Sequence, residues 1–354
     1  MPIIEATRLY DVTVRLQIFV EAVKAYQARQ FDRVLIGVRN EFDKLLGRLN
    51  FETLDGLTRT RLRALVMALK LSQSRLYSVY MEDVLKQLEA FTNAALVVNK
   101  TVYAALRSNL TFDITQGEEA LNSYLRALGQ QPEDESAAWL FGFAALTNPS
   151  RTWNNVINEP VAANGAYVKD FYRAFAASAQ LSTANLLTKA YANATSTPKV
   201  REELKQTLTK IDNQSAAVSN TVMQHIAAIV SQTVASGLFG RYRWVSVIDS
   251  STTDICYGRN NKIYFYGKGP LPPAHIGCRS ITVPYQNGQD TTSETFYAFL
   301  QRQSSQIQVV AMGEAGAKLL RTGRIKANEV MKFANPAPLS PAQFQASIPL
   351  ILNG

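Results

Sequence analysis

The sequence predicts an α+β protein that is mainly helical over its N-terminal two-thirds. A small C-terminal α+β domain with a short antiparallel sheet and an extended C-terminal arm is expected to follow. Apolar residues recur at helical spacing through the first third of the chain, as on the buried face of an amphipathic helix. From Tyr242 onward, the chain has short segments in which aromatic or β-branched residues alternate with polar ones, separated by Gly, Asn and Pro. This pattern is typical of strands and turns. A hydrophobic content of 47% in 354 residues is sufficient for a buried core.

Residues 1–110 are expected to form a bundle or hairpin of long helices. A break falls at Asp55-Gly56, and Thr58 is a favoured N-cap residue for a second helix that runs to about residue 107. The apolar positions that define the first helical stretch are Leu16, Phe19, Val23, Tyr26, Val34, Val38, Phe42, Leu45 and Leu49.

Residues 111–237 are expected to form a more interrupted helical region. Pro198 suits the first turn of a long helix, because the missing N–H of proline has no helical partner there in any case. Helices are expected at 115–129, 166–178, 182–193 and 199–235, with loops at 148–155 and 158–165.

Residues 238–333 are expected to form the α+β domain. Its strands are predicted within 241–250, 262–267 and 280–285, and its helices at 292–303 and 314–321. Residues 334–354 contain four prolines and no charged residue, a composition that predicts an extended arm.

Net charge is +9, and the charge is unevenly distributed. Residues 1–110 contribute +5, residues 111–234 contribute −2, and residues 235–335 contribute +6. Basic ends are compatible with contact to double-stranded DNA or to an acidic protein surface. Ordinary solvated lysine and arginine on helix faces would give the same totals, so both interpretations stay open.

The sequence shows no sign of a membrane span or of a disulfide framework. No stretch approaches the roughly 18 uncharged apolar residues of a spanning helix, and the first twenty residues contain Glu5, Arg8, Asp11 and Arg15. We therefore expect a soluble product made in a cytoplasm. Two cysteines exclude an extensive disulfide framework but not a single bridge.

Both cysteines and one of the two histidines fall within residues 254–278. Cys256, His275 and Cys278 carry side chains that bind metals, and the H-x2-C spacing lets two ligands from one turn reach a tetrahedral zinc ion. The nearby candidates for a fourth ligand, Asp249 and Asp254, are weak. A zinc site, a Cys256–Cys278 disulfide and a pair of reduced buried cysteines all remain open.

Catalytic motifs are missing from the sequence. It contains no G-x-S-x-G, Walker A or H-E-x-x-H pattern. Asp249 and Asp254 flank four Ser and Thr residues and could form an acid and base pair, although such residues more often fix a loop by hydrogen bonds to the backbone. His225 lies among Ala and Ile and is expected to be a hydrogen-bonded histidine between helices. We expect no catalytic residues.

Residues 238–333 contain a specific succession of motifs. An aromatic strand ends at Asp249, a turn with Thr253 and Asp254 leads to Cys256, and a hairpin with Asn and Gly follows. The next residues match a P-P-x-H-x-x-C-R pattern and then an aromatic helix with a closing L-x-x-x-G-x-I segment. The matching positions are Pro272, Pro273, His275, Cys278, Arg279, Gln301, Arg302, Gln303, Gly313, Leu319, Leu320, Gly323 and Ile325.

This succession resembles the phage Mu F-like head morphogenesis, or minor capsid, proteins of tailed bacteriophages. The resemblance implies a structural protein of the virion, present in multiple copies at the portal or capsid interior and needed for head assembly. It implies contact with the portal or major capsid protein, no membrane and no catalytic residues. The family often has C-R-C where this chain has Cys278-Arg279-Ser280, so a full set of cysteine and histidine ligands is missing.

Two further functions remain as alternatives. The chain could be an internal virion protein that binds DNA and is ejected with the genome, in which case its binding would weaken steeply with salt. It could also be an enzyme, either a nuclease or a transferase.

Overall fold

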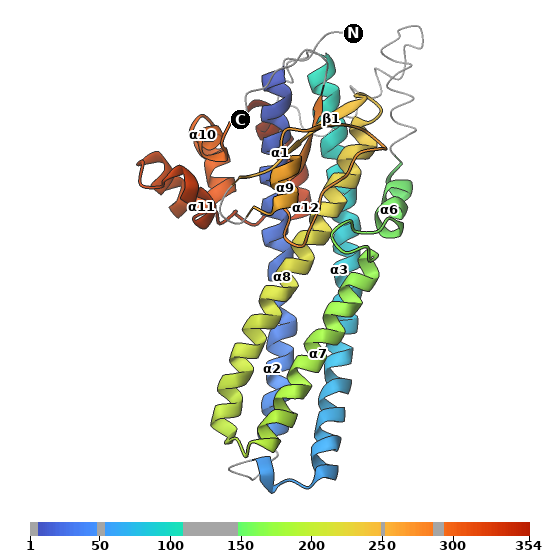
Figure 1. The fold of residues 1–354 in the computed structure, drawn as a ribbon, viewed down its shortest axis with the longest axis vertical. Coiled ribbons are helices and arrows are strands. Elements are labelled where there is room, and N and C mark those ends of the chain that lie inside the picture. The colour runs from blue at the N-terminus through green and yellow to red at the C-terminus, as the bar shows by residue number, and fades with distance from the viewer. Residues whose placement is uncertain (1–5, 48–53, 109–147, 249–251, 286–293) are drawn as a thin grey trace. The chain divides into compact units, whose positions relative to one another are not determined.

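The structure is a computed structural model that describes residues 6–47, 54–108, 148–248, 252–285 and 294–354 (Figure 1). It confirms the predicted fold class, because the chain is mainly helical with a three-stranded antiparallel sheet in its C-terminal part. The predicted helix at 115–129 lies outside the described residues.

The helical elements before the sheet are α1 (Ala6–Arg29), α2 (Asp32–Gly47), η1 (Leu54–Gly56), α3 (Arg59–Ser108), α6 (Pro149–Asn158), α7 (Val168–Ala192) and α8 (Thr197–Ala235). The sheet region contains β1 (Arg241–Val245), α9 (Asp254–Arg259), β2 (Ile263–Phe265) and β3 (Ile281–Tyr285). The chain then forms α10 (Phe296–Gln301), α11 (Ser305–Arg321), η3 (Ala327–Lys332), α12 (Pro341–Ala346) and α13 (Ile348–Asn353).

The chain divides into two compact units made of segments that are not consecutive in sequence. Unit 1 contains residues 1–26, 89–165 and 221–354, and unit 2 contains residues 27–88 and 166–220. The division expected from the sequence, at residues 110, 237 and 333, stays a prediction. In the structure, α1, α3 and α8 each contribute residues to both units.

Unit 2 is a helical bundle with an aromatic core. Phe31 is fully buried, and its ring centroid lies 5.1 Å from that of Tyr80 and 5.3 Å from that of Phe175, both in edge-on geometry. Edge-on aromatic pairs add to the stability gained from burying their area. A buried polar contact also joins two helices of this unit, since the Thr183 hydroxyl donates to Gln73 Oε1 at 2.9 Å.

The sheet in unit 1 has the strand order β2-β1-β3, and both pairings are antiparallel. Along β1, Tyr242 and Trp244 are fully buried, whereas Arg241, Arg243 and Val245 are half-buried. This alternation follows from the two-residue period of a strand, which sends successive side chains to opposite faces. The central strand thus anchors the sheet through its two large aromatic residues.

The C-terminal segment is helical rather than extended, so the predicted arm is wrong from residue 341 onward. Ser340 and Gln343 form a capping box at the start of α12, and Pro341 occupies the first turn. Phe344 is fully buried, with its ring centroid 5.9 Å from that of Phe91 on α3. Two of the four prolines that indicated an extended chain, Pro341 and Pro349, instead lie in the first turns of α12 and α13, where proline is tolerated.

Other helix boundaries also differ from the expectations. The predicted loop at 148–155 is largely α6, whose N-cap Asn148 accepts a hydrogen bond from the Arg151 backbone N–H. The two helices expected at 166–178 and 182–193 are the single helix α7. The helix expected from residue 314 is the second half of α11, which begins at Ser305 and is kinked at Gly313.

We expect Phe31→Ala to lower the free energy of unfolding by about 3–5 kcal/mol, because it removes a buried ring and leaves a cavity. Chemical denaturation measures this change. Leu181→Ala is the control, since Leu181 is 54% exposed and its loss should change the free energy by less than about 0.5 kcal/mol. Equal effects of the two substitutions would contradict the assigned core.

Candidate metal centre and neighbouring cavities

Cys256, His275 and Cys278 converge at one point of unit 1. Cys256 lies on α9, and His275 and Cys278 lie in the loop that leads to β3. Their ligand atoms all lie within 4.8 Å of one another. Cys256 Sγ is 3.2 Å from His275 Nε2 and 3.7 Å from Cys278 Sγ. Both cysteines are free, so the disulfide considered from the sequence is not formed in this structure.

The imidazole of His275 has a defined tautomer. Its Nδ1 lies 2.9 Å from the backbone carbonyl oxygen of Ile276. A carbonyl oxygen can only accept a hydrogen bond, so Nδ1 carries the hydrogen. In the neutral ring the lone pair is therefore on Nε2, the nitrogen that faces Cys256 Sγ.

The two thiols lie in a small aromatic core. Cys256 and Cys278 are buried together with Tyr242 and Trp244. Burial raises the pKa of the Cys256 thiol, because the thiolate loses hydration there. The Thr253 side chain is next to this sulfur, and its buried hydroxyl oxygen has no hydrogen-bond partner among the described residues.

Ser246 connects β1, α9 and the loop before β3. Its hydroxyl donates to the Cys256 carbonyl oxygen at 3.0 Å and accepts from Trp244 Nε1 at 2.9 Å. Since its one O–H is directed to that carbonyl, Ser280 must be the donor in the 2.9 Å contact between the two serine hydroxyls. Ser280 thus holds the loop in place through its side chain.

Helix α8 holds the same loop through two hydrogen bonds. Gln224 Nε2 donates to the Ser280 carbonyl oxygen at 2.9 Å, and Thr221 Oγ1 accepts from the Gly277 backbone N–H at 3.1 Å. Gln224 Oε1 in turn accepts from Lys24 Nζ at 2.6 Å and from Gln17 Nε2 at 2.9 Å. The loop that carries His275 and Cys278 is therefore fixed at both ends of its turn.

A cavity of about 380 Å³ adjoins the three side chains. Cys256 and His275 line it, together with Arg279, Ser280 and Lys332 among others. The cavity gives solvent or a small ligand access to the space beside the sulfur and the imidazole.

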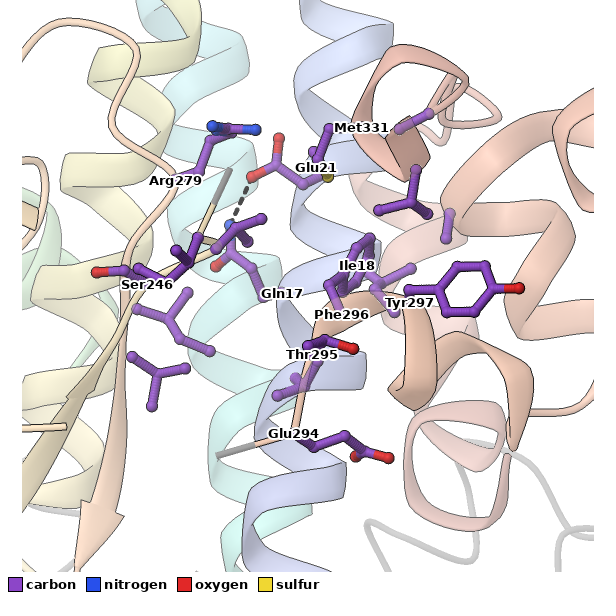
Figure 2. Close-up of a pocket in the computed structure, with 18 of the residues that line it drawn as sticks. Gln17, Ile18, Glu21, Ser246, Arg279, Glu294, Thr295, Phe296, Tyr297 and Met331 are labelled. Atoms are coloured by element: carbon purple, nitrogen blue, oxygen red, sulfur yellow. Dashed lines mark hydrogen bonds between the residues drawn. The ribbon is translucent and has the colours of Figure 1, made fainter. Parts of the chain in front are cut away.

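A larger cavity of about 530 Å³ lies between α1, the half-buried face of β1, the start of α10 and η3 (Figure 2). Apolar side chains such as Ile18, Phe296 and Met331 line it, and Glu21 and Arg279 add charged groups. Its volume is within the range of small-molecule sites, which also combine apolar walls with a few polar groups.

The positions of the other motif residues near Cys256, His275 and Cys278 are as follows. Asp249 lies outside the described residues, and Asp254 is exposed in the first turn of α9. The proposed acid and base pair therefore stays a prediction. Pro272 and Pro273 are buried, and Arg279 is half-buried between the two cavities.

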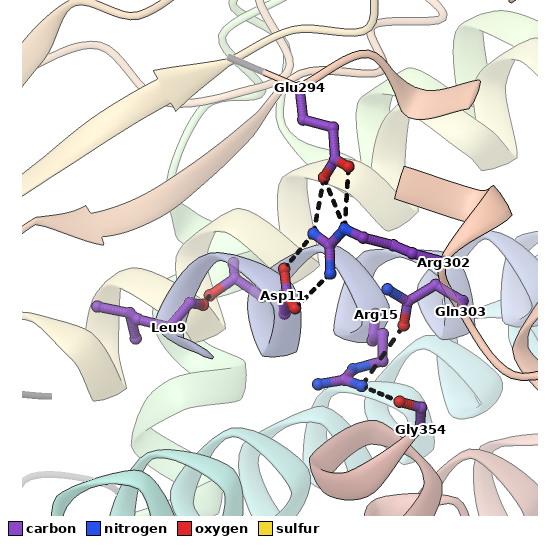
Figure 3. A network of polar contacts seen from close by, with 8 residues as sticks. Leu9, Asp11, Arg15, Glu294, Arg302, Gln303 and Gly354 are labelled. Atoms are coloured by element: carbon purple, nitrogen blue, oxygen red, sulfur yellow. Dashed lines mark hydrogen bonds and ion pairs between the residues drawn. The ribbon is translucent and has the colours of Figure 1, made fainter. Parts of the chain in front are cut away.

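The downstream motif anchors α10 and α11 to α1 (Figure 3). Arg302 donates to Asp11 on α1 and to Glu294, with its shortest contacts at 2.5 Å and 2.7 Å. Gln303 is 7% exposed, and its Oε1 accepts from Arg15 Nη1 at 3.4 Å. The contacts of Arg302 with the two carboxylates are bidentate, a geometry that strengthens pairs between a guanidinium group and a carboxylate.

The two motif glycines have positive φ angles, +67° for Gly313 and +68° for Gly323. A Cβ at position 313 would lie 2.8 Å from the Asn335 carbonyl oxygen, whereas position 323 has open space around it. Gly313 is therefore required both by its backbone conformation and by a close approach.

Sequence reasoning did not identify several residues that position the site. Thr221 and Gln224 lie in a helix that shows only ordinary helical periodicity, and Ser246 directly follows the last residue of β1. Asp11 is one acidic residue on an amphipathic helix. No local pattern distinguishes such residues, because each has a partner far along the chain. Ser280 lies 56 positions from Gln224 and 34 from Ser246, and Arg302 lies 291 positions from Asp11.

Comparison with known protein families, with curated proteins and with solved structures finds no match for this chain. Within the described ranges, no helix combines the length and apolar character that crossing a membrane requires.

His225 is 2% exposed, and its Nε2 lies 3.2 Å from the Val156 carbonyl oxygen. Burial lowers the pKa of His225, with the hydrogen bond to Val156 opposing this effect. Below the unfolded-state pKa of about 6.5, the unfolded chain therefore binds more protons than the folded chain. This contribution to stability is complete above about pH 6.5 and is lost as pH falls from there to the lowered pKa.

We expect His225→Gln to reduce the loss of stability between about pH 7.5 and pH 5.5, because the amide can donate to Val156 without titrating. Denaturant unfolding at both pH values measures the difference. The same fall in wild type and variant would contradict the assignment to His225.

Proposed function

We propose that the chain is a structural minor capsid, or head morphogenesis, protein of a tailed bacteriophage. In this role it is made in the host cytoplasm and is incorporated in multiple copies in the virion, at the portal or the capsid interior. Its partners are the portal protein, the major capsid protein or both.

The observation that carries this proposal is what the motif residues do within unit 1. Pro272, Pro273 and Cys278 belong to the buried turn region that leads to β3, and Trp244 anchors the central strand. Arg302 joins α10 to α1 through its contact with Asp11. Residues that resemble the family pattern thus contribute to folding and to element attachment, which suits a protein whose activity is assembly.

A second function, DNA binding inside the virion, is favoured by one surface feature. Arg59, Arg61 and Arg63 are exposed in the first turns of α3. No ion pair of these three arginines with other described residues is found. Exposed guanidinium groups of this kind can contact phosphates without reading base sequence.

Deleting the gene from the phage should give empty or non-infectious heads, and wild-type particles should contain the chain. Particle titre, electron microscopy and mass spectrometry of purified virions measure these results.

Complementation with Gly313→Ala should restore infectivity poorly, because a Cβ there approaches the Asn335 carbonyl oxygen to 2.8 Å. Gly240→Ala is the matched control, since no atom lies within 4 Å of its added Cβ. Normal infectious particles from the deletion would overturn the proposal.

For the second function, we expect duplex DNA to be retarded at low salt, with affinity falling steeply as salt increases. Replacing Arg59, Arg61 and Arg63 by Ala should reduce the magnitude of the log–log salt slope by about 3, one for each lost phosphate contact. A triple substitution of exposed residues on α7, Lys169, Arg173 and Lys189 to Ala, changes the net charge equally and is the control. No retardation by the wild-type chain would exclude this function.

A further inference from the structure

We propose that Cys256, His275 and Cys278 bind one zinc ion, with a water molecule from the adjoining cavity as the fourth ligand. The inference concerns the internal architecture of unit 1 and does not depend on the proposed role in the virion. It is carried by the distances among the three side chains, the tautomer of His275 and the cavity beside them.

The distances already approach those of a tetrahedral zinc site. With Zn–S bonds of about 2.3 Å and Zn–N bonds of about 2.0–2.1 Å, tetrahedral angles place two sulfurs about 3.8 Å apart and a sulfur and a nitrogen about 3.6 Å apart. The sulfurs of Cys256 and Cys278 are 3.7 Å apart, and Cys256 Sγ is 3.2 Å from His275 Nε2. The sulfur of Cys278 and the imidazole lie within 4.8 Å of one another. Only small side-chain adjustments are needed to receive the ion.

The second shell is that of a metal-binding histidine. His275 uses its Nδ1 hydrogen on the Ile276 carbonyl oxygen at 2.9 Å, so Nε2 offers its lone pair toward the two sulfurs. Histidine ligands almost always donate their other ring hydrogen in this way, which fixes the ring orientation. The unpartnered Thr253 hydroxyl beside Cys256 can donate to a metal-bound thiolate.

The loop is held in place by hydrogen bonds that do not involve the proposed ligand atoms. Gln224 and Thr221 on α8 fix its backbone at Ser280 and Gly277, and Ser246 ties Ser280 to the Cys256 turn. His275 and Cys278 lie on one fixed turn, and Cys256 lies on α9. Metal binding therefore has to restrict less backbone motion than it would in a flexible loop. Ser280 takes part in this support. The serine at this position therefore still leaves Cys256, His275 and Cys278 as three possible ligands.

The identity of the metal follows from the donor atoms. Two thiolates and one imidazole favour zinc among the common divalent ions, whereas oxygen-rich sites favour magnesium, calcium and manganese. Because Cys256 and His275 line the 380 Å³ cavity, water can reach the remaining tetrahedral position. Hydrated zinc loses all but one of its water ligands as two Zn–S bonds and one Zn–N bond form, and the two thiol protons are released to solvent.

Measuring metal uptake by the full-length chain tests the proposal. The protein is purified with a reducing agent, its zinc content is determined by mass spectrometry, and the metal-free form is titrated with cobalt(II). We expect about one zinc ion per chain and, with cobalt, the intense visible bands of a tetrahedral ion and a near-ultraviolet sulfur-to-cobalt band.

Cys256→Ser and His275→Gln should each weaken cobalt binding by at least about 10-fold, a loss no smaller than that from removing a second-shell group. Tyr257→Phe is the matched control, because Tyr257 is 67% exposed on the same helix and its substitution should leave uptake unchanged. Circular dichroism establishes that each variant is folded.

Three results would overturn the proposal. The first is a folded, reduced wild-type chain that takes up neither zinc nor cobalt. The second is a Cys256→Ser variant that binds cobalt as tightly as wild type, which would assign the metal to another site. The third is a Cys256–Cys278 disulfide in the purified chain whose reduction yields no metal binding.

Discussion

The rest of unit 1 depends on the hydrogen bonds of the buried Gln224 amide. Its oxygen accepts hydrogen bonds from Lys24 and Gln17 on α1, and its nitrogen donates to the carbonyl oxygen of Ser280 just before β3. A buried polar group without partners would cost about 1–3 kcal/mol, so three elements must keep their positions for these bonds to form. The amide thereby specifies how α1, α8 and the sheet pack together.

This constraint explains why Cys256, His275 and Cys278 are held close together. The loop from His275 to Ser280 is held by α8 at its backbone and by Ser246 at its end. Burial of Cys256 and Cys278 beside Trp244 then keeps both sulfurs close to the imidazole. A zinc ion in this position would join α9 to the loop before β3 and would add to a packing arrangement that hydrogen bonds already define.

The outer elements of unit 1 attach through a different kind of contact. Arg302 spans Asp11 and Glu294, and Arg15 reaches Gln303 and the Gly354 carbonyl oxygen (Figure 3). The side chain of Arg302 is 38% exposed, so water screens its ion pairs. These pairs therefore orient α10 against α1 more than they raise the free energy of unfolding. Such contacts place α10 and α13 against α1 and leave the 530 Å³ cavity between α1 and the sheet open.

The sequence by itself determined the fold class, the long helices and the three strands, because periods of 3.6 and 2 residues are local properties. It also identified Cys256, His275 and Cys278, since these residue types are rare in this chain. Only the tertiary structure decided that the uncharged tail forms helices and buries Phe344, and that the two units combine distant segments. It likewise decided that three side chains up to 22 positions apart meet beside a cavity. Those outcomes depend on contacts between residues far apart in the sequence, and no local pattern encodes such contacts.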